Sequence, residues 1–150
     1  RKVLAGIALV GLTFAGGKPE NGAHWGYTGK IGPAYWGDLS PNYIMCKIGK
    51  NQSPIDIDEK KAVKACLQPL KVDYTADSKY VVNNGHTVKV VTAGKSYIEV
   101  DGKRFYLLQF HFHAPSEHTV NGKHYPFEAH FVHADREGNL AVVAVLFKVG

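Results

Sequence analysis

Gln109-Phe110-His111-Phe112-His113 alternates polar and aromatic residues along a short stretch. Successive side chains of a β-strand point to opposite faces, so the glutamine and both histidines share one face and the phenylalanines share the other. The phenylalanines suit a hydrophobic core, and the histidines then project together on the opposite side. The stretch therefore predicts a strand with one apolar face and one histidine face.

A second segment, residues 128–133, has the same character. Read as a strand, it places Glu128, His130 and Val132 on one face. The loop before it contains Asn121-Gly122, a pair typical of tight hairpin turns, so the chain can double back after the first strand. If the two strands are neighbours, three imidazoles meet at one point.

The rest of the second half shows short strand patterns separated by turns. We expect strands at Leu70–Tyr74, Tyr80–Asn83, Thr87–Thr92, Ser96–Val100, Arg104–His113, Ala129–Ala134 and Leu140–Lys148. The turn pairs between them are Asn84-Gly85, Ala93-Gly94, Asp101-Gly102, Asn121-Gly122 and Glu137-Gly138. Asp58 to Leu67 is the only stretch suggesting a helical turn or two, and residues 18–54 look irregular. The pattern predicts a mainly β fold with a large, mostly antiparallel sheet.

Size and charge limit the classes of function. The 150 residues suffice for one domain with a core, and the formal net charge is +5. The lysines are spread along the chain and do not cluster with aromatic residues, so we expect no nucleic-acid partner.

The N-terminus differs in composition from the rest. Arg1 and Lys2 precede an apolar run from Val3 to Phe14, and small residues follow it. This pattern predicts a secretory signal peptide over residues 1–17, with an uncleaved anchor as the alternative. The run is too short to span a bilayer comfortably, so we expect no stable membrane span after cleavage, and a periplasmic or secreted protein.

An oxidising compartment permits disulfides. Cys46 and Cys66 could pair with each other, pair with another chain or stay reduced, and their spacing does not decide between these outcomes.

The three histidines His111, His113 and His130 predict a metal site. Three neutral imidazoles suit Zn²⁺ and leave a fourth position open, where the metal lowers the pKa of a bound water from about 15.7 to about 7. Gln109 and Glu128 each precede a histidine by two residues, on the same face, and can hold its other ring nitrogen.

A cupin-type metal oxygenase is the competing metal fold. The spacing His111-x-His113-x-x-x-Glu117 matches the first half of its motif, with Glu117 as a further ligand. Phe105 and His124 stand where that motif has glycines, which counts against this alternative.

Six separated blocks resemble the α-class carbonic anhydrases, of the exported bacterial kind. They are residues 24–27 (HWGY), 51–57 (NQSPIDI), 83–86 (NNGH), 109–113 (QFHFH), 116–120 (SEHTV) and 128–133 (EAHFVH). The resemblance implies the fold of that family, with a large twisted sheet and few short helices, over residues 18–150. It implies the reversible hydration of carbon dioxide to bicarbonate and a proton.

The resemblance also implies roles for individual residues. His111, His113 and His130 fall on the zinc ligands, and Gln109 and Glu128 on the residues that orient them. His86 falls on the proton shuttle, and an exposed histidine titrates in the range suited to that task. Glu117 falls on a carboxylate that accepts a hydrogen bond from a threonine, which in turn orients the zinc-bound hydroxide; this chain does not include that threonine.

Other matches are to the surroundings of the metal. Tyr27 and Asn84 fall on residues that order water, and Val132 and Val142 on the apolar wall of the carbon dioxide pocket. Lys89 stands where many members carry Asn or Gln. His118 falls on a buried structural histidine, while His124 and His133 receive no chemical role.

The family domain is longer than this chain, so we expect residues 18–150 to be its N-terminal portion. The strand Leu140–Lys148 would then be an exposed edge. In bacterial members the cysteine at the position of Cys46 commonly pairs with one in the other half. Expected ligands are carbon dioxide or bicarbonate, and sulfonamide or anion inhibitors; a homo-oligomer stays open. A non-catalytic zinc-binding fragment is the alternative to the enzyme.

Overall fold

The computed structural model describes residues 5–10 and 23–150. The chain forms two compact units, one of Arg1–Thr13 with Ser53–Gly150 and one of Phe14–Gln52, and each is considered by itself. The first unit contains every strand in the described ranges, and the second contains every helix there. The mainly β class expected from the sequence is confirmed.

The strands of the first unit follow the predicted pattern closely. They are β1 (Ala5–Val10), β2 (Asp56–Ile57), β3 (Lys71–Asp73), β4 (Ser78–Asn83), β5 (Val88–Thr92), β6 (Tyr97–Val100), β7 (Lys103–His113), β8 (Thr119–Val120), β9 (Lys123–His124), β10 (Phe127–Ala134) and β11 (Leu140–Phe147). All seven predicted strands are present, with ends that differ by at most two residues.

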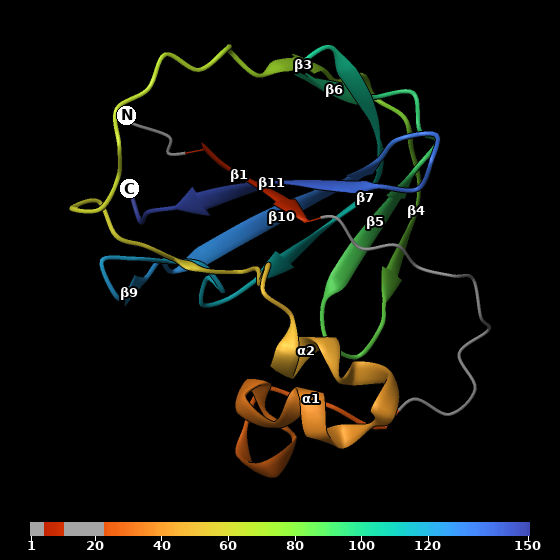
Figure 1. Cartoon of the computed structure of the whole chain (residues 1–150). Coiled ribbons are helices and arrows are strands. Elements are labelled where there is room, and N and C mark those ends of the chain that lie inside the picture. Colours follow the sequence, from red (N-terminus) through yellow and green to blue (C-terminus); the bar gives the residue numbers. More distant parts are fainter. Residues whose placement is uncertain (1–4, 11–22) are drawn as a thin grey trace. The chain divides into compact units, whose positions relative to one another are not determined.

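Most strands form one twisted sheet (Figure 1). Its order is β1-β11-β10-β7-β5-β4, and every pairing in it is antiparallel. Strand β7 is long enough to pair with β6 through its first half and with β5 through its second half. The short strands β2, β8 and β9 form a separate sheet, in which β2 and β8 run parallel. The expected large antiparallel sheet is therefore confirmed.

Two tight turns show why local sequence places these strands so well. Asp101 and Gly102 between β6 and β7 have φ of 49° and 76°, and Asn121 and Gly122 between β8 and β9 have φ of 51° and 75°. Positive φ at both central residues produces the turn whose twist matches that of antiparallel strands. Asp or Asn followed by Gly tolerates this conformation at low cost, so the hairpins form where these pairs occur.

A bulge in β7 changes which residues face the core. Pairing with β10 passes from Gln109 opposite Val132 to Leu107 opposite His133, which leaves Leu108 without a partner in this ladder. An extra residue shifts the alternation of side chains by one. Leu107 therefore lies on the same face as Phe110, although the two numbers differ in parity.

The core forms on this aromatic face. Its buried residues are Ile98, Phe105, Ala141 and Val143, and Phe131 packs against them. The rings of Phe110 and Phe131, opposite each other on β7 and β10, stack with centroids 5.4 Å apart. This apolar layer supports the sheet from one side and leaves the other face for polar residues.

The predicted exposed edge at Leu140–Lys148 is wrong, because β11 has neighbours on both sides. Strand β1 pairs with it from Ala5 opposite Val145 to Val10 opposite Leu140. Six backbone positions of β11 are thereby paired rather than exposed to solvent.

Apart from Ala5–Val10, residues 1–17 of the predicted signal peptide lie outside the described residues, and the signal peptide stays a prediction.

The predicted helical turns at Asp58–Leu67 are replaced by one turn, closed by the bond from Lys61 N–H to Asp58 C=O at 3.0 Å. These residues lie almost entirely on the surface, and a short segment that packs against nothing gains too little to remain helical.

Helices occur instead in the stretch expected to be irregular. They are η1 (Gly29–Ile31), η2 (Pro33–Tyr35), α1 (Trp36–Leu39), η3 (Pro41–Tyr43) and α2 (Met45–Ile48). Pro33 and Pro41 each occupy a first helical position, where proline has a suitable φ and its missing N–H costs nothing. The expectation of few, short helices is confirmed.

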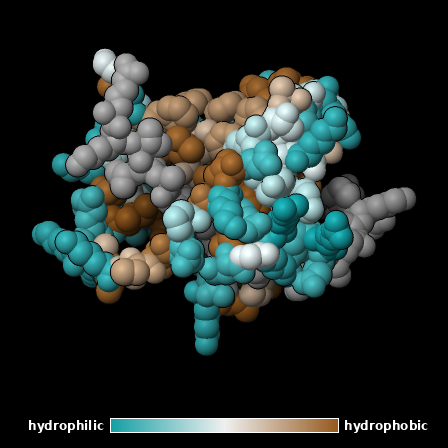
Figure 2. Space-filling model, turned by 90° about the horizontal axis from the view of Figure 1, so that it is seen from above, coloured by the Kyte–Doolittle hydropathy of each residue, from teal (hydrophilic) through white to brown (hydrophobic). Residues whose placement is uncertain are grey.

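Among residues 5–10 and 23–150, no helix combines the length and hydropathy needed to cross a membrane. On the face seen in Figure 2, hydrophobic residues, drawn in brown, are exposed beside hydrophilic ones, drawn in teal. Cys46 and Cys66 are both exposed, and both are free thiols.

Candidate metal centre

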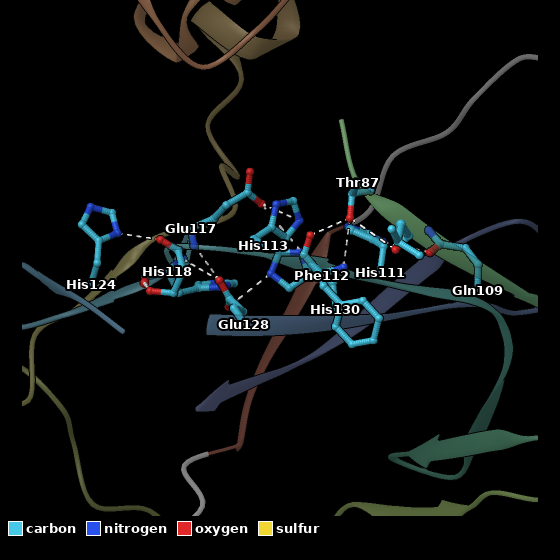
Figure 3. Close-up of polar contacts among 12 residues, drawn as sticks. Thr87, Gln109, His111, Phe112, His113, Glu117, His118, His124, Glu128 and His130 are labelled. Atoms are coloured by element: carbon cyan, nitrogen blue, oxygen red, sulfur yellow. Dashed lines mark hydrogen bonds and ion pairs between the residues drawn. The ribbon is translucent and has the colours of Figure 1, made fainter. Parts of the chain in front are cut away.

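The structure brings His111, His113 and His130 together on the face of the sheet opposite the core (Figure 3). One ring nitrogen of each lies within 4.8 Å of the others. The ring centroids are 4.7 to 5.3 Å apart. Two causes produce this cluster: His111 and His113 alternate on β7, and the register with β10 sets His130 directly opposite His111.

The Gln109 side chain fixes the orientation of the His111 ring. Its Oε1 lies 2.8 Å from His111 Nδ1. An amide oxygen can only accept, so Nδ1 carries the proton and Nε2 keeps its lone pair. This is the contact expected from the spacing of the two residues along the strand.

Glu128 lies beneath His130 and is fully buried. Its Oε1 is 3.1 Å from His130 Nε2 and 2.6 Å from His118 Nδ1. Its Oε2 accepts the backbone N–H groups of Glu117 at 2.7 Å and His118 at 3.0 Å. The carboxylate therefore fixes the His130 ring so that Nδ1 is the nitrogen available to the cluster.

Glu128 stays ionised despite its burial. Burial by itself would raise the pKa of this carboxyl, but the hydrogen bond from His118 and the adjacent His130 imidazole hold the pKa well below its usual range. A negative charge next to a ligating imidazole increases the basicity of that imidazole. His118, expected only to be structural, thus shares the carboxylate that orients His130, a contact that strand alternation could not reveal.

Two imidazoles of the cluster, those of His111 and His113, favour their neutral form. Burial, together with the neighbouring His130 and His113, lowers the pKa of His111 to about 4. Burial also lowers the pKa of His113. Metal binding requires neutral histidine, so at neutral pH these two residues present lone pairs rather than charges. Three imidazoles on one face, two of them held by Gln109 and Glu128, fit zinc.

The Glu117 carboxylate lies at the rim of the cluster. Its Oε2 is 3.2 Å from His113 Nε2 and 3.8 Å from His130 Nδ1. Its predicted bond to a threonine involves a residue outside this chain, so that role stays a prediction.

His86 lies on the turn between β4 and β5, and its side chain is exposed. Asn84 holds this turn, because its Oδ1 accepts the backbone N–H groups of His86 at 3.0 Å and Thr87 at 2.9 Å. The side-chain oxygen of Asn84 therefore has a structural task in addition to the predicted ordering of water.

The remaining predicted residues lie in two places. Val132 and Val142 are directly opposite each other on β10 and β11, half-buried, and Val132 shares the face of His130. Tyr27 belongs to the other unit, where its ring makes edge-to-face contacts with Trp25 and Trp36, each at 5.7 Å. His124 Nδ1 contacts Ser116 C=O at 2.6 Å, consistent with a structural residue.

The sequence profile of the eukaryotic-type carbonic anhydrases matches residues 31–150. The carbonic anhydrase of Pectobacterium atrosepticum is 41% identical over 144 residues, which are 96% of this chain and 58% of that protein. The enzyme of Neisseria gonorrhoeae is 41% identical over 150 residues, covering 99% of this chain and 59% of that protein. The chain thus spans less than two thirds of the length of these relatives.

Solved structures agree with these matches. The α-carbonic anhydrase of Thermovibrio ammonificans, solved with the inhibitor sulfanilamide, is 73% identical with a TM-score of 0.81, covering 87% of this chain and 57% of that one. Dioscorin complexed with ascorbate is 33% identical with a TM-score of 0.79, covering 85% and 55%. These likenesses favour the α-class interpretation over the cupin alternative. The chain belongs to the eukaryotic-type, or α-class, carbonic anhydrase family.

Proposed function

We propose that the protein to which this chain belongs catalyses the reversible hydration of carbon dioxide to bicarbonate and a proton. The observation that carries the proposal is the cluster of His111, His113 and His130 in a chain of this family. Zinc held by these three residues would supply a Lewis acid that brings the pKa of a bound water close to neutrality.

The protein residues then orient the ligands and shape the site. Gln109 and Glu128 hold the outer nitrogens of His111 and His130, which fixes both rings before any metal arrives. A site organised in advance does not lose binding energy to the ordering of its ligands.

The apolar side chains of Val132 and Val142 suit a small, uncharged substrate. They form an apolar strip beside His130, on the same face of the sheet. An apolar wall next to a polar centre suits carbon dioxide, which offers little to hydrogen-bond donors. Asn84 is proposed to order water through which a proton leaves, and the same role for Tyr27, in the other unit, stays a prediction.

His86 is proposed as the group that passes this proton to buffer. It is exposed on a turn that Asn84 fixes, so its imidazole can exchange protons with solvent while its backbone stays in place. Glu117 is proposed to accept the hydrogen bond of a threonine elsewhere in the protein.

The sequence supports a periplasmic or secreted location through the basic and apolar pattern of residues 1–17. Sulfonamide inhibition is proposed because a structural neighbour binds sulfanilamide.

The proposal is tested by metal analysis together with a carbon dioxide hydration assay on the natural protein. We expect about one zinc per chain and hydration that a sulfonamide blocks. His130→Ala should abolish both zinc retention and hydration, whereas His124→Ala, which removes an exposed histidine, should leave both intact.

Two results would count against the enzyme. Hydration that survives His130→Ala would contradict the assigned ligands. Full zinc content without hydration would favour the alternative, a non-catalytic zinc-binding protein.

A further inference from the structure

The hydroxyl of Thr87 makes two contacts with a single residue of β7. Thr87 Oγ1 donates to Phe112 C=O at 2.6 Å, and Phe112 N–H donates back to Oγ1 at 3.2 Å. Figure 3 shows Thr87 above the backbone of Phe112, between the two histidines that flank it. One hydroxyl thus holds both backbone polar groups of the residue that separates His111 from His113.

The position of Thr87 explains why a side chain, rather than the backbone of β5, bonds the backbone of Phe112. Pairing of β5 with β7 runs from Val91 opposite Gln109 to Lys89 opposite His111. Thr87 precedes β5, where the backbone already bends into the turn. The backbone N–H and C=O of a strand residue require hydrogen-bond partners. The ladder of β5 and β7 ends at His111, so the Thr87 hydroxyl, in place of a residue of β5, bonds both groups of Phe112.

Thr87 is itself held in place by the turn. Its N–H donates to Asn84 Oδ1 at 2.9 Å, and its C=O accepts the N–H of Asn84 at 3.2 Å. The hydroxyl therefore connects two segments far apart in the sequence: the turn that carries His86 and the strand that carries two of the candidate ligands.

We propose that Thr87 is a positioning residue for the metal, whose hydroxyl sets the separation of the His111 and His113 rings. This inference rests on the proposed zinc site. Zinc accepts ligand distances within about 0.2 Å of their ideal values, so a small displacement of the backbone at Phe112 moves both rings out of range. Groups that hold metal ligands in place typically contribute 10- to 100-fold in metal affinity.

The test compares three variants of the natural protein. Thr87→Val keeps the shape and removes the hydroxyl, and Thr87→Ser keeps the hydroxyl. Thr92→Val is the matched control, because Thr92 Oγ1 donates to Leu107 C=O at 2.5 Å, at the end of β5 away from the histidines. The readouts are the zinc dissociation constant from chelator competition, the visible spectrum of the cobalt-substituted protein and the unfolding midpoint.

We expect Thr87→Val to raise the zinc dissociation constant roughly 10-fold and to alter the cobalt spectrum, with Thr87→Ser close to the wild type. Thr92→Val should lower the unfolding midpoint and leave zinc affinity unchanged. An unchanged dissociation constant in Thr87→Val, or an equal loss in Thr92→Val, overturns the inference. Should Thr87→Val fail to fold, Thr87→Ala replaces it in the same comparison.

These readouts separate the inference from the proposed function. A protein that hydrates carbon dioxide but binds zinc equally well with valine at position 87 overturns only the role of Thr87. A protein that binds zinc with the expected pattern and shows no hydration overturns only the catalytic proposal.

Discussion

His130 and His133 lie three residues apart on β10, on opposite faces of the same sheet, and both are buried. His130 faces two other imidazoles and rests on the Glu128 carboxylate. His133 faces the core, where its Nε2 is 2.8 Å from Tyr74 Oη and its Nδ1 is 3.2 Å from Ala141 C=O. Neutral partners occupy both nitrogens of His133, whereas the partner of His130 is an anion that leaves one nitrogen for a metal.

The difference shows that the partners of a histidine, rather than its burial, distinguish a candidate ligand from a core residue. A backbone carbonyl can only accept, so His133 Nδ1 carries the proton and Nε2 accepts the tyrosine O–H. Its bonding capacity is used within the fold. Four substitutions or conditions test this contrast.

Glu128→Ala should have the largest effect. It removes a fully buried carboxylate that accepts two backbone N–H groups and the His118 imidazole and lies 3.1 Å from His130 Nε2. Breaking a buried charged cluster typically costs about 3–5 kcal/mol of stability, and zinc affinity should fall with it. Urea unfolding and chelator competition measure both quantities. A stable variant with wild-type zinc affinity would contradict the role given to this carboxylate.

Tyr74→Phe should lower the stability of the fold by a smaller amount and leave zinc binding unchanged. It removes the O–H that His133 Nε2 accepts, and a buried polar atom left without a partner costs about 1–3 kcal/mol. Zinc affinity should match the wild type, because this pair lies on the core face. A shift in zinc affinity would mean that the two faces are coupled through β10.

Gln109→Ala should show the reverse pattern. The fold should keep its stability to within about 1 kcal/mol, since the lost bond lies in a part-buried place. Zinc affinity should fall roughly 10-fold, because the ring of His111 is no longer oriented. Equal zinc binding in Gln109→Ala and the wild type would show that the register of β7 and β10 alone orients this ligand.

The smallest effect should be on the pH dependence of stability. Burial lowers the pKa of His133, while in the unfolded chain this histidine titrates near its usual value of about 6.5. As pH falls through that value the unfolded state binds the proton first, so stability is full above about pH 6.5 and declines below it. Tyr74, the titratable group beside this ring, stays neutral in that range because burial raises its pKa to about 12.

Unfolding midpoints of the wild type and His133→Gln between pH 7.5 and pH 5 check this expectation. The variant should decline less steeply, and His124→Gln, at an exposed position, should follow the wild type. A steeper decline in His133→Gln would contradict the assignment of a neutral buried histidine.

Sequence alone determined the elements whose causes are local. Alternation in residues 109–113 placed the glutamine and two histidines on one face, and the Asp-Gly and Asn-Gly pairs placed two hairpins. The partner of His111 also followed from local spacing, because residues two apart on a strand are neighbours on one face. All seven predicted strands are present.

Tertiary structure decided what depends on distant partners. The bulge at Leu108 exists only in the pairing of β7 with β10, and β11 gained β1 as a neighbour from the opposite end of the chain. His118 lies in a loop, and only the folded chain brings its ring to Glu128. Asp58–Leu67 packs against no other element, so these residues do not form a helix. The hydroxyl of Thr87 acquired its task only when the turn before β5 met β7 at Phe112, because a hydrogen bond across 25 residues leaves no periodic trace in the sequence.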